Sequence, residues 1–264
     1  MGKNRPSGPC HLCGCVGPLS FEHVPPRSAF NDRKVVLHQG EQVIGLGPGE
    51  RPRRPGQIIQ QGRGAFTLCA KCNNKTGRWY GSRFAAWCHQ GMESLTAAGG
   101  KPSLVQLHYM FPLAILKQIA TMFFSINSNG FCDAHPELQE FVLDKEKTGL
   151  SSEYRFFVYY FGGGALRSAG VTGRMNVETG ELLAFSELVF PPFGYVLTFG
   201  QNAPDSRLAE ISHFADFKFE DFRVGHVSLP VLETRLVLPG DYRTLAEIQR
   251  DYDENRKTER SPEA

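Results

Sequence analysis

The sequence Cys10-His11-Leu12-Cys13 places two cysteines on one short turn near the start of the chain, and Cys69-Ala70-Lys71-Cys72 repeats this spacing more than fifty residues later. Two such turns provide four thiolates, the ligand set of a closed, tetrahedral, structural zinc site. The chain has seven cysteines, and an odd number with this spacing suits zinc in a reducing compartment better than a disulfide framework. We therefore predict a cytoplasmic protein with one structural zinc ion, held by Cys10, Cys13, Cys69 and Cys72.

The segment between the cysteine pairs predicts a short β-hairpin that leads into a helix. Leu19–Val24 has the pattern of a strand, and the two prolines directly after it prevent the strand from continuing. Gly64–Leu68 is a second short strand, which runs into the second cysteine pair. A helix is expected from Asn73, whose side chain suits a helix start, to about Leu95.

This arrangement predicts that the zinc holds three polar side chains close together. Glu22 and His23 lie at the end of the first strand, and Asn73 follows the last cysteine. Carboxylate and amide oxygens suit Mg²⁺ or Mn²⁺, which take few protein ligands and complete their shell with water and phosphate oxygens. A neutral imidazole can take a proton from water near pH 7. We therefore expect Glu22 and Asn73 to bind a catalytic Mg²⁺ or Mn²⁺, and His23 to be the general base of phosphodiester hydrolysis.

The same residues resemble a known family. Cys-x-x-Cys, then Glu22-His23-Val24-Pro25-Pro26, then Leu68-Cys69-x-x-Cys72-Asn73-Asn74, looks like the zinc-containing branch of the HNH endonucleases, over about residues 8–90. The resemblance implies a ββα-metal finger, in which a two-stranded ribbon packs on a helix. It also implies that His23 is the general base and that Glu22 and Asn73 bind the catalytic metal. Asn74 is the substitute if the alignment shifts by one residue.

One position departs from the family's pattern. The family has a middle Asn that precedes the second cysteine pair by a few residues, braces the loop and orients the catalytic His. Gly64 or Ala65 holds that place here. The resemblance therefore leaves the brace of His23 unassigned.

The charges are distributed unevenly along the chain. Residues 1–100 carry thirteen Lys/Arg and five Asp/Glu, whereas residues 101–264 carry sixteen and twenty-two. A basic front half suggests that a polyanion binds there, and we expect nucleic acid, with DNA favoured over RNA. The side chains expected to contact its phosphates are Arg51, Arg53, Arg54, Arg63, Lys75 and Arg78.

The complete chain is expected to have an α+β fold. Residues 1–99 are the predicted HNH-like zinc domain, a ββα-metal, treble-clef-like unit, and residues 254–264 are a predicted disordered tail. Residues 100–253 are expected to form an α+β domain with an antiparallel sheet. Its predicted helices span 112–126, 136–147 and 242–253, and its predicted strands span 104–109, 155–161, 170–177, 182–190, 195–199, 214–222 and 224–231. A further hairpin is expected from residues 34–37 and 42–46.

The second domain carries no catalytic cluster in its sequence. We expect it to regulate the nuclease, to form a homo-oligomer or to bind a regulatory protein partner. Stand-alone HNH proteins with a second domain resemble prokaryotic anti-phage or mobile-element nucleases, which is an analogy at the level of the family. Lys117 and Gln118 interrupt the longest apolar run, so no membrane partner is expected.

Two other functions stay open from the sequence. The first is a zinc-stabilised nucleic-acid-binding module whose active site has decayed, an alternative that the missing middle Asn favours. The second is a nuclease that cleaves RNA, because the same kind of site can cleave either backbone.

Overall fold

The two cysteine pairs lie at the same end of a small antiparallel sheet. A computed structural model describes residues 5–43, 52–99, 101, 103–175, 180–200, 202–235 and 238–259. Its first sheet has the order β1-β2-β5, formed by β1 (Ser7–Pro9), β2 (Val16–His23) and β5 (Gly64–Cys69). Strand β2 ends at His23, as predicted from the prolines that follow it.

The helix after β5 begins earlier than the sequence suggested. Helix α2 (Ala70–Thr76) follows β5 directly, and the Cys69 sulfur caps it by accepting a hydrogen bond from the backbone N–H of Cys72. The prediction that Asn73 starts the helix is therefore wrong, because the Cys69 sulfur takes the capping role. A π-helical turn, Gly77–Gly81, joins α2 to α3 (Ser82–Ala97).

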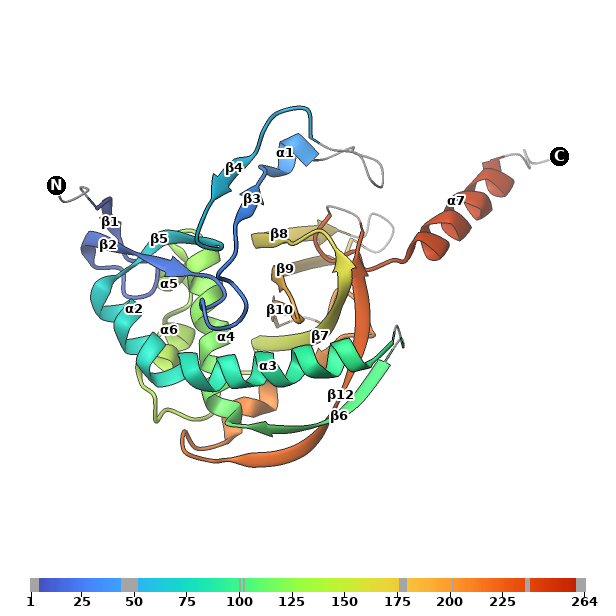
Figure 1. Ribbon diagram of the computed structural model, residues 1–264. Coiled ribbons are helices and arrows are strands. Elements are labelled where there is room, and N and C mark those ends of the chain that lie inside the picture. The colour runs from blue at the N-terminus through green and yellow to red at the C-terminus, as the bar shows by residue number, and fades with distance from the viewer. Residues whose placement is uncertain are drawn as a thin grey trace.

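The connection between β2 and β5 forms an arm that projects from the body (Figure 1). Strand β3 (Val35–Leu37) pairs with β4 (Gln57–Ile59), and the short helix α1 (Gly40–Val43) follows β3. The expected strand at 42–46 is therefore wrong for residues 42 and 43, and residues 44–46 lie outside the described residues. A local hydrogen bond explains the turn, since the Gln42 side chain accepts from the Gln39 N–H at 3.1 Å.

The second sheet is mixed, not purely antiparallel. Its strand order is β6-β12-β7-β10-β9-β8, and the short strand β11 also pairs with β7. Strand β12 runs parallel to β7, and a long connection allows this orientation. The other pairs are antiparallel. The strands are β6 (Ser103–Met110), β7 (Tyr154–Gly164), β8 (Ser168–Met175), β9 (Leu182–Phe190), β10 (Phe193–Phe199), β11 (Ala209–Glu210) and β12 (Arg223–Thr234).

Three further predictions about residues 100–264 need correction. The expected strand at 214–222 is absent among the described residues, and Ser212–Asp216 is a 3-10 helix, η2. Helix α6 (Pro136–Leu143) ends before residue 147, because the buried Lys117 ammonium binds the carbonyls of Asp144 and Lys147. Helix α7 (Leu245–Glu259) begins three residues late and continues into the expected disordered tail.

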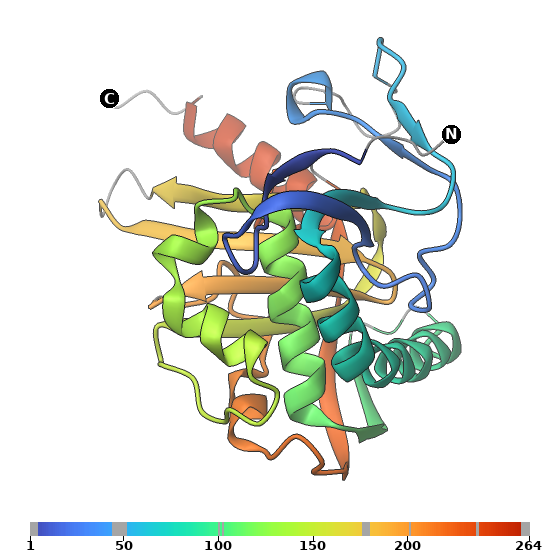
Figure 2. The same cartoon turned by 90° about the vertical axis from the view of Figure 1, so that its left-hand side faces the viewer.

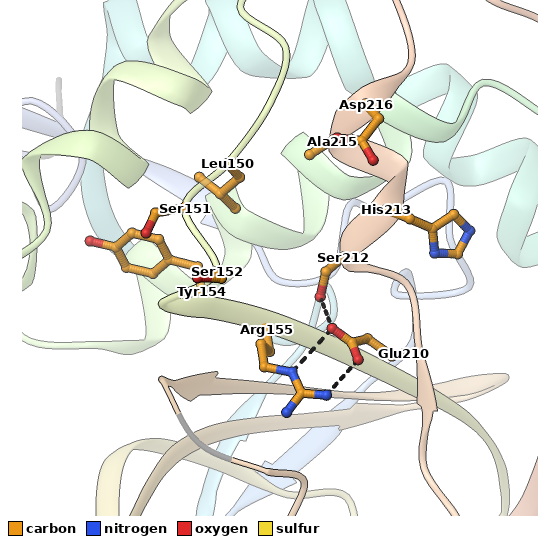
Figure 3. Close-up of a pocket in the computed structure, with 10 residues that line it drawn as sticks. All are labelled: Leu150, Ser151, Ser152, Tyr154, Arg155, Glu210, Ser212, His213, Ala215 and Asp216. Atoms are coloured by element: carbon orange, nitrogen blue, oxygen red, sulfur yellow. Dashed lines mark hydrogen bonds and ion pairs between the residues drawn. The ribbon is translucent and has the colours of Figure 1, made fainter.

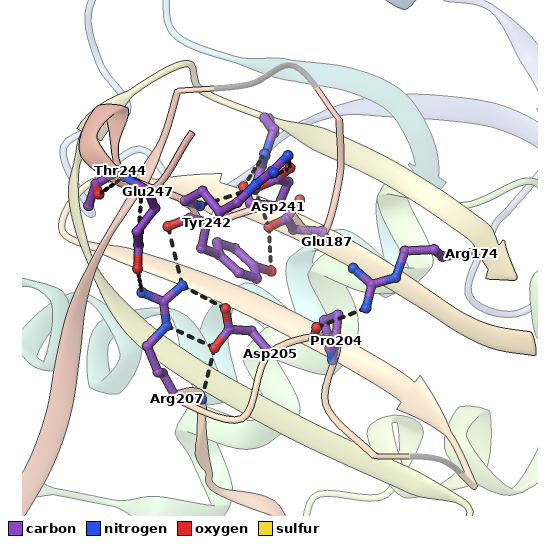
Figure 4. A network of polar contacts seen from close by, with 11 residues as sticks. Arg174, Glu187, Pro204, Asp205, Arg207, Asp241, Tyr242, Thr244 and Glu247 are labelled. Carbon is purple, nitrogen blue, oxygen red and sulfur yellow. Dashed lines mark hydrogen bonds and ion pairs between the residues drawn. The ribbon is translucent and has the colours of Figure 1, made fainter. Parts of the chain in front are cut away.

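The start of α7 is set by a reciprocal cap. The Thr244 hydroxyl accepts from the Glu247 N–H at 3.2 Å, and the Glu247 carboxylate accepts from the Thr244 N–H at 2.6 Å. Such a pair satisfies two N–H groups that a helix end leaves free. Figure 4 shows how Arg207 joins this helix start to Asp205. On the same face of the sheet, Glu187 accepts from the Tyr242 hydroxyl at 2.7 Å and pairs with Arg167 at 2.8 Å.

Helix α4 (Pro112–Ile126) connects the two halves of the molecule. It contacts β8 and β9 of the large sheet, and also α3, β5 and the π-helical turn of the front half (Figure 2). The short helix α5 (Phe131–Ala134) and α6 follow it. One hydrophobic core includes residues from both halves, from Leu12 and Trp87 to Leu113 and Phe193. The expected boundary at residue 99 falls between α3 and β6. No helix in the described ranges is long and apolar enough to cross a bilayer.

We predict that His108 makes stability depend on pH. Its ring is fully buried beside Trp87, and burial lowers the pKa of His108 to about 4. An unfolded histidine has a pKa near 6.5. The unfolded state therefore takes up the proton first, so stability is lost as pH falls from about 6.5 to about 4. At pH 5 the loss is about 2 kcal/mol.

Urea unfolding at pH 7 and pH 5 tests this expectation. His108→Gln should show a smaller difference between the two pH values than the wild type, because every other titrating group is common to both proteins. An equal pH dependence in both proteins would contradict it.

Candidate functional site

The four cysteines of the two pairs converge in space. The sulfurs of Cys10, Cys13, Cys69 and Cys72 all lie within 4.8 Å of one another and could hold a metal ion. Cys13 and Cys69 sulfurs are 3.9 Å apart. Thiolates in this number and geometry suit a metal such as zinc, with no position left for a substrate. The other described cysteines lie outside the cluster.

Local structure explains why the first pair docks against β5. Thr67 is an extra residue at a bulge in β5, and its carbonyl accepts from the His11 N–H at 2.9 Å. The Cys69 N–H donates to the Cys10 sulfur at 3.3 Å. Hydrogen bonds from the Cys72 thiol and from this N–H lower the pKa of Cys10, which favours the thiolate that a metal requires.

A small hollow lies between the end of β2, helix α2 with the π-helical turn, and α4. Its volume is about 160 Å³. Glu22, His23 and Asn73 all line it, so the structure brings together the three residues that the sequence singled out. The remaining lining residues are Phe21, Pro26, Arg27, Thr76, Gly77 and Gln118.

His23 is oriented by a backbone carbonyl. Its Nε2 lies 3.0 Å from the oxygen of Gln61. A carbonyl oxygen only accepts, so Nε2 carries the proton and Nδ1 is the acceptor of the neutral ring. The ring also packs edge-on against Phe21, at 5.0 Å between centroids. This arrangement leaves one imidazole nitrogen able to accept a proton.

Glu22 turns toward the interior, because adjacent residues of a strand point to opposite faces. It is 5% exposed, and its carboxylate accepts a hydrogen bond from Ser125 of α4. Burial raises the pKa of Glu22 to about 8, although the Ser125 hydrogen bond acts in the opposite direction. A cation beside the carboxylate would favour its charged form again.

Asn73 is held by β2. Its Nδ2 donates to the Ser20 hydroxyl and to the Phe21 carbonyl, both at 3.1 Å. Among the described residues, its amide oxygen has no hydrogen-bond donor. The orientation therefore leaves an oxygen of Asn73 available as a ligand. The neighbouring Asn74 is exposed and does not line the hollow.

The residue that braces His23 is Asn31, which the sequence analysis missed. Asn31 is fully buried, and its Nδ2 donates to the carbonyls of Pro25 at 2.6 Å and Arg63 at 2.7 Å. Its oxygen accepts from the Arg63 N–H at 2.6 Å. One amide therefore joins the turn after β2 to the turn before β5, which are the two segments that flank His23.

Gly64 explains why no Asn stands at the place, a few residues before the second cysteine pair, where the family has its middle Asn. A Cβ at Gly64 would lie 2.1 Å from the carbonyl oxygen of Glu22, so the hairpin closes only around glycine. Gly62 has a φ of +94° and passes equally close to the backbone of Asn31. The sequence signal that could have indicated this brace is the pair of glycines on either side of Arg63, together with an Asn shortly after two prolines.

The basic residues expected to contact nucleic acid differ in their exposure to solvent. Arg53 and Arg54 are exposed on the segment before β4, Arg78 is exposed on the π-helical turn, and Arg51 lies outside the described residues. Arg63 is mostly buried, which lowers its pKa to about 10. The Lys75 ammonium donates to the Leu143 carbonyl at 2.8 Å and lies over the Trp79 ring, and its phosphate contact stays a prediction. Arg27, which was not predicted, lines the hollow and is exposed.

A second hollow, of about 220 Å³, lies near the start of β7 (Figure 3). Two of its charged groups satisfy each other, since Arg155 pairs with Glu210 at 2.6 Å, and Glu210 also accepts from the Ser212 hydroxyl. We assign no function to it. Comparison of the chain with protein-family models, with curated proteins and with solved structures found no match.

Removing one cluster thiolate is expected to remove the metal. We predict that Cys13→Ser loses bound zinc and melts at a lower temperature, because metal binding at such sites is coupled to folding. Elemental analysis and thermal unfolding measure both effects. Cys15→Ser is the matched control, because Cys15 is exposed and lies outside the cluster, and it should keep the wild-type zinc content. A Cys13→Ser protein with full zinc would contradict the assignment.

Loss of the Asn31 side chain should destabilise the hairpin. A buried backbone group that loses its partner costs about 1–3 kcal/mol, so we expect Asn31→Ala to lose about 3 kcal/mol or more of unfolding free energy. Urea denaturation measures the loss. The control is Asn74→Ala, which removes an exposed amide from α2 and should change stability by less than about 0.5 kcal/mol. Equal stabilities of the two variants would refute the bracing role.

Proposed function

We propose that the protein is a metal-dependent endonuclease of the HNH type that hydrolyses phosphodiester bonds of DNA. The observation that carries this proposal is the single hollow lined by Glu22, His23 and Asn73 beside a four-cysteine cluster. In this proposal β2, β5 and α2 are the ββα-metal finger, and the cluster holds a structural Zn²⁺. The family resemblance in the sequence points to the same residues.

The donors in the hollow suit a hard divalent cation. A carboxylate from Glu22 and an amide oxygen from Asn73 are ligands that Mg²⁺ and Mn²⁺ accept. Gln118 lines the same hollow, and its buried amide oxygen has no hydrogen-bond partner among the described residues. When bound there, Mg²⁺ or Mn²⁺ would stabilise the negative charge that develops on the phosphate and the leaving oxygen.

The residues of the chain have separate roles in the proposed reaction. His23 takes a proton from the attacking water at Nδ1, while its Nε2–H stays bound to the Gln61 carbonyl. Asn31 holds both turns that position this ring. The Arg27 side chain, exposed at the rim, suits a phosphate of the substrate, and Arg53, Arg54 and Arg78 are further candidates.

The expected role of the second half stays a prediction. A homo-oligomer or a regulatory protein partner would suit the exposed apolar side chains of β6, which are Val105, Leu107 and Tyr109. An anti-phage or mobile-element role rests on the family analogy alone. The buried contact between Ser125 and Glu22 is a route by which this half could influence cleavage.

The proposal predicts that cleavage depends on His23 and on a divalent cation. The zinc-loaded protein is incubated with supercoiled plasmid, linear duplex or RNA, in Mg²⁺, Mn²⁺ or EDTA. Wild type should nick the plasmid with either metal and not with EDTA. His23→Ala should lower the rate by at least about 100-fold, the usual contribution of a general base, with its zinc content unchanged.

His226→Ala is the matched control, because His226 is exposed on β12 and does not line the hollow. It should cleave at the wild-type rate. Cleavage of RNA alone would favour the RNA-cleaving alternative. A wild-type protein that binds DNA but cuts neither polymer with any divalent metal would favour the decayed binding module and reject the nuclease.

A further inference from the structure

Gln118 of helix α4 lines the hollow, although α4 belongs to neither the β2–β5 hairpin nor the helix α2 that form the proposed finger. Gln118 is 3% exposed and lines the same hollow as Glu22, His23 and Asn73. Its amide oxygen is enclosed and has no hydrogen-bond partner among the described residues. An amide buried in this way costs free energy unless a ligand satisfies it.

The neighbours of Gln118 do not explain its polarity. Helix α4 is otherwise buried and mostly apolar, and the polar side chains that it buries elsewhere have partners. Lys117 binds two carbonyls, Thr121 donates to the Lys117 carbonyl, and Ser125 donates to Glu22. Gln118 is therefore the buried polar residue of this helix for which the described residues supply no partner.

We propose that Gln118 is a third protein oxygen ligand of the divalent cation bound by Glu22 and Asn73. This inference rests on the proposed function, because it concerns the same cation. The amide oxygen of Gln118 has no competing donor among the described residues, so it is free to bind a cation in the hollow that this side chain lines. Three neutral or singly charged oxygens leave several positions of an octahedral shell for water and phosphate.

This assignment gives residues beyond the finger a direct part in the site. Ser125 lies seven residues after Gln118, so both project from one face of α4. Ser125 contacts the Glu22 carboxylate, and Gln118 completes the set of protein ligands. The cation then joins the finger to α4, and any displacement of α4 weakens cation binding.

The test measures Mn²⁺ binding to zinc-loaded protein without substrate, by electron paramagnetic resonance of free Mn²⁺ and by calorimetry. Gln118→Leu should bind Mn²⁺ about tenfold more weakly or worse, while its melting temperature stays equal or rises, because the change removes an unpartnered buried amide. Gln118→Glu restores an oxygen ligand and should bind more tightly than Gln118→Leu. Gln249→Leu, at an exposed position of α7, is the control and should bind as the wild type does.

The outcomes separate this inference from the proposed function. Asn73→Ala reports whether the cation site itself exists. If Asn73→Ala loses Mn²⁺ and Gln118→Leu keeps the wild-type affinity, Gln118 is not a ligand and only this inference fails. A Gln118→Glu protein that binds as weakly as Gln118→Leu also overturns it. If the wild type binds no Mn²⁺ beyond its zinc, the cation site fails, and the inference fails with it.

Discussion

The convergence of four sulfur atoms is the constraint on which the site depends. All four lie within 4.8 Å of one another, although Cys13 and Cys69 are 56 residues apart. This convergence fixes the junction at which β5 ends and α2 begins. Asn73 stands one residue after the last thiolate, so its amide is carried against β2, where Ser20 and Phe21 accept from it. The cluster itself has no free position for chemistry, and its effect is to place the Asn73 side chain beside the end of β2.

The opposite end of the same hairpin is held by hydrogen bonds. Asn31 binds the backbone of both turns, and two glycines allow the strands to approach closely enough for it to do so. The carbonyl of Gln61, in the second of these turns, orients His23. The cysteine cluster and the buried Asn31 amide therefore act on different ends of one hairpin. Helix α4 closes the third side, where Ser125 contacts Glu22 and Gln118 borders the hollow.

Local signals predicted much of this arrangement. Cysteine spacing indicated the cluster, the prolines predicted where β2 ends, and the apolar run predicted α4 at 112–126. What the sequence could not reveal depended on distant partners. Asn31 acts through Arg63, thirty-two residues away, and Lys75 donates to the carbonyl of Leu143, sixty-eight residues away. The parallel pairing of β12 with β7 has no local signature either. Gln118 was recognised only as a polar interruption of an apolar run.

A direct measurement of the central claim is anomalous diffraction from crystals of the zinc-loaded protein grown with Mn²⁺ and a short DNA duplex. Data collected on both sides of the zinc edge and near the manganese edge separate the two metals. We predict a zinc peak among Cys10, Cys13, Cys69 and Cys72, and a separate manganese peak in the hollow lined by Glu22 and Asn73, with a phosphate of the DNA beside it. Zinc in the cysteine cluster with no manganese in the hollow, at a Mn²⁺ concentration that supports cleavage, would contradict the proposed active site.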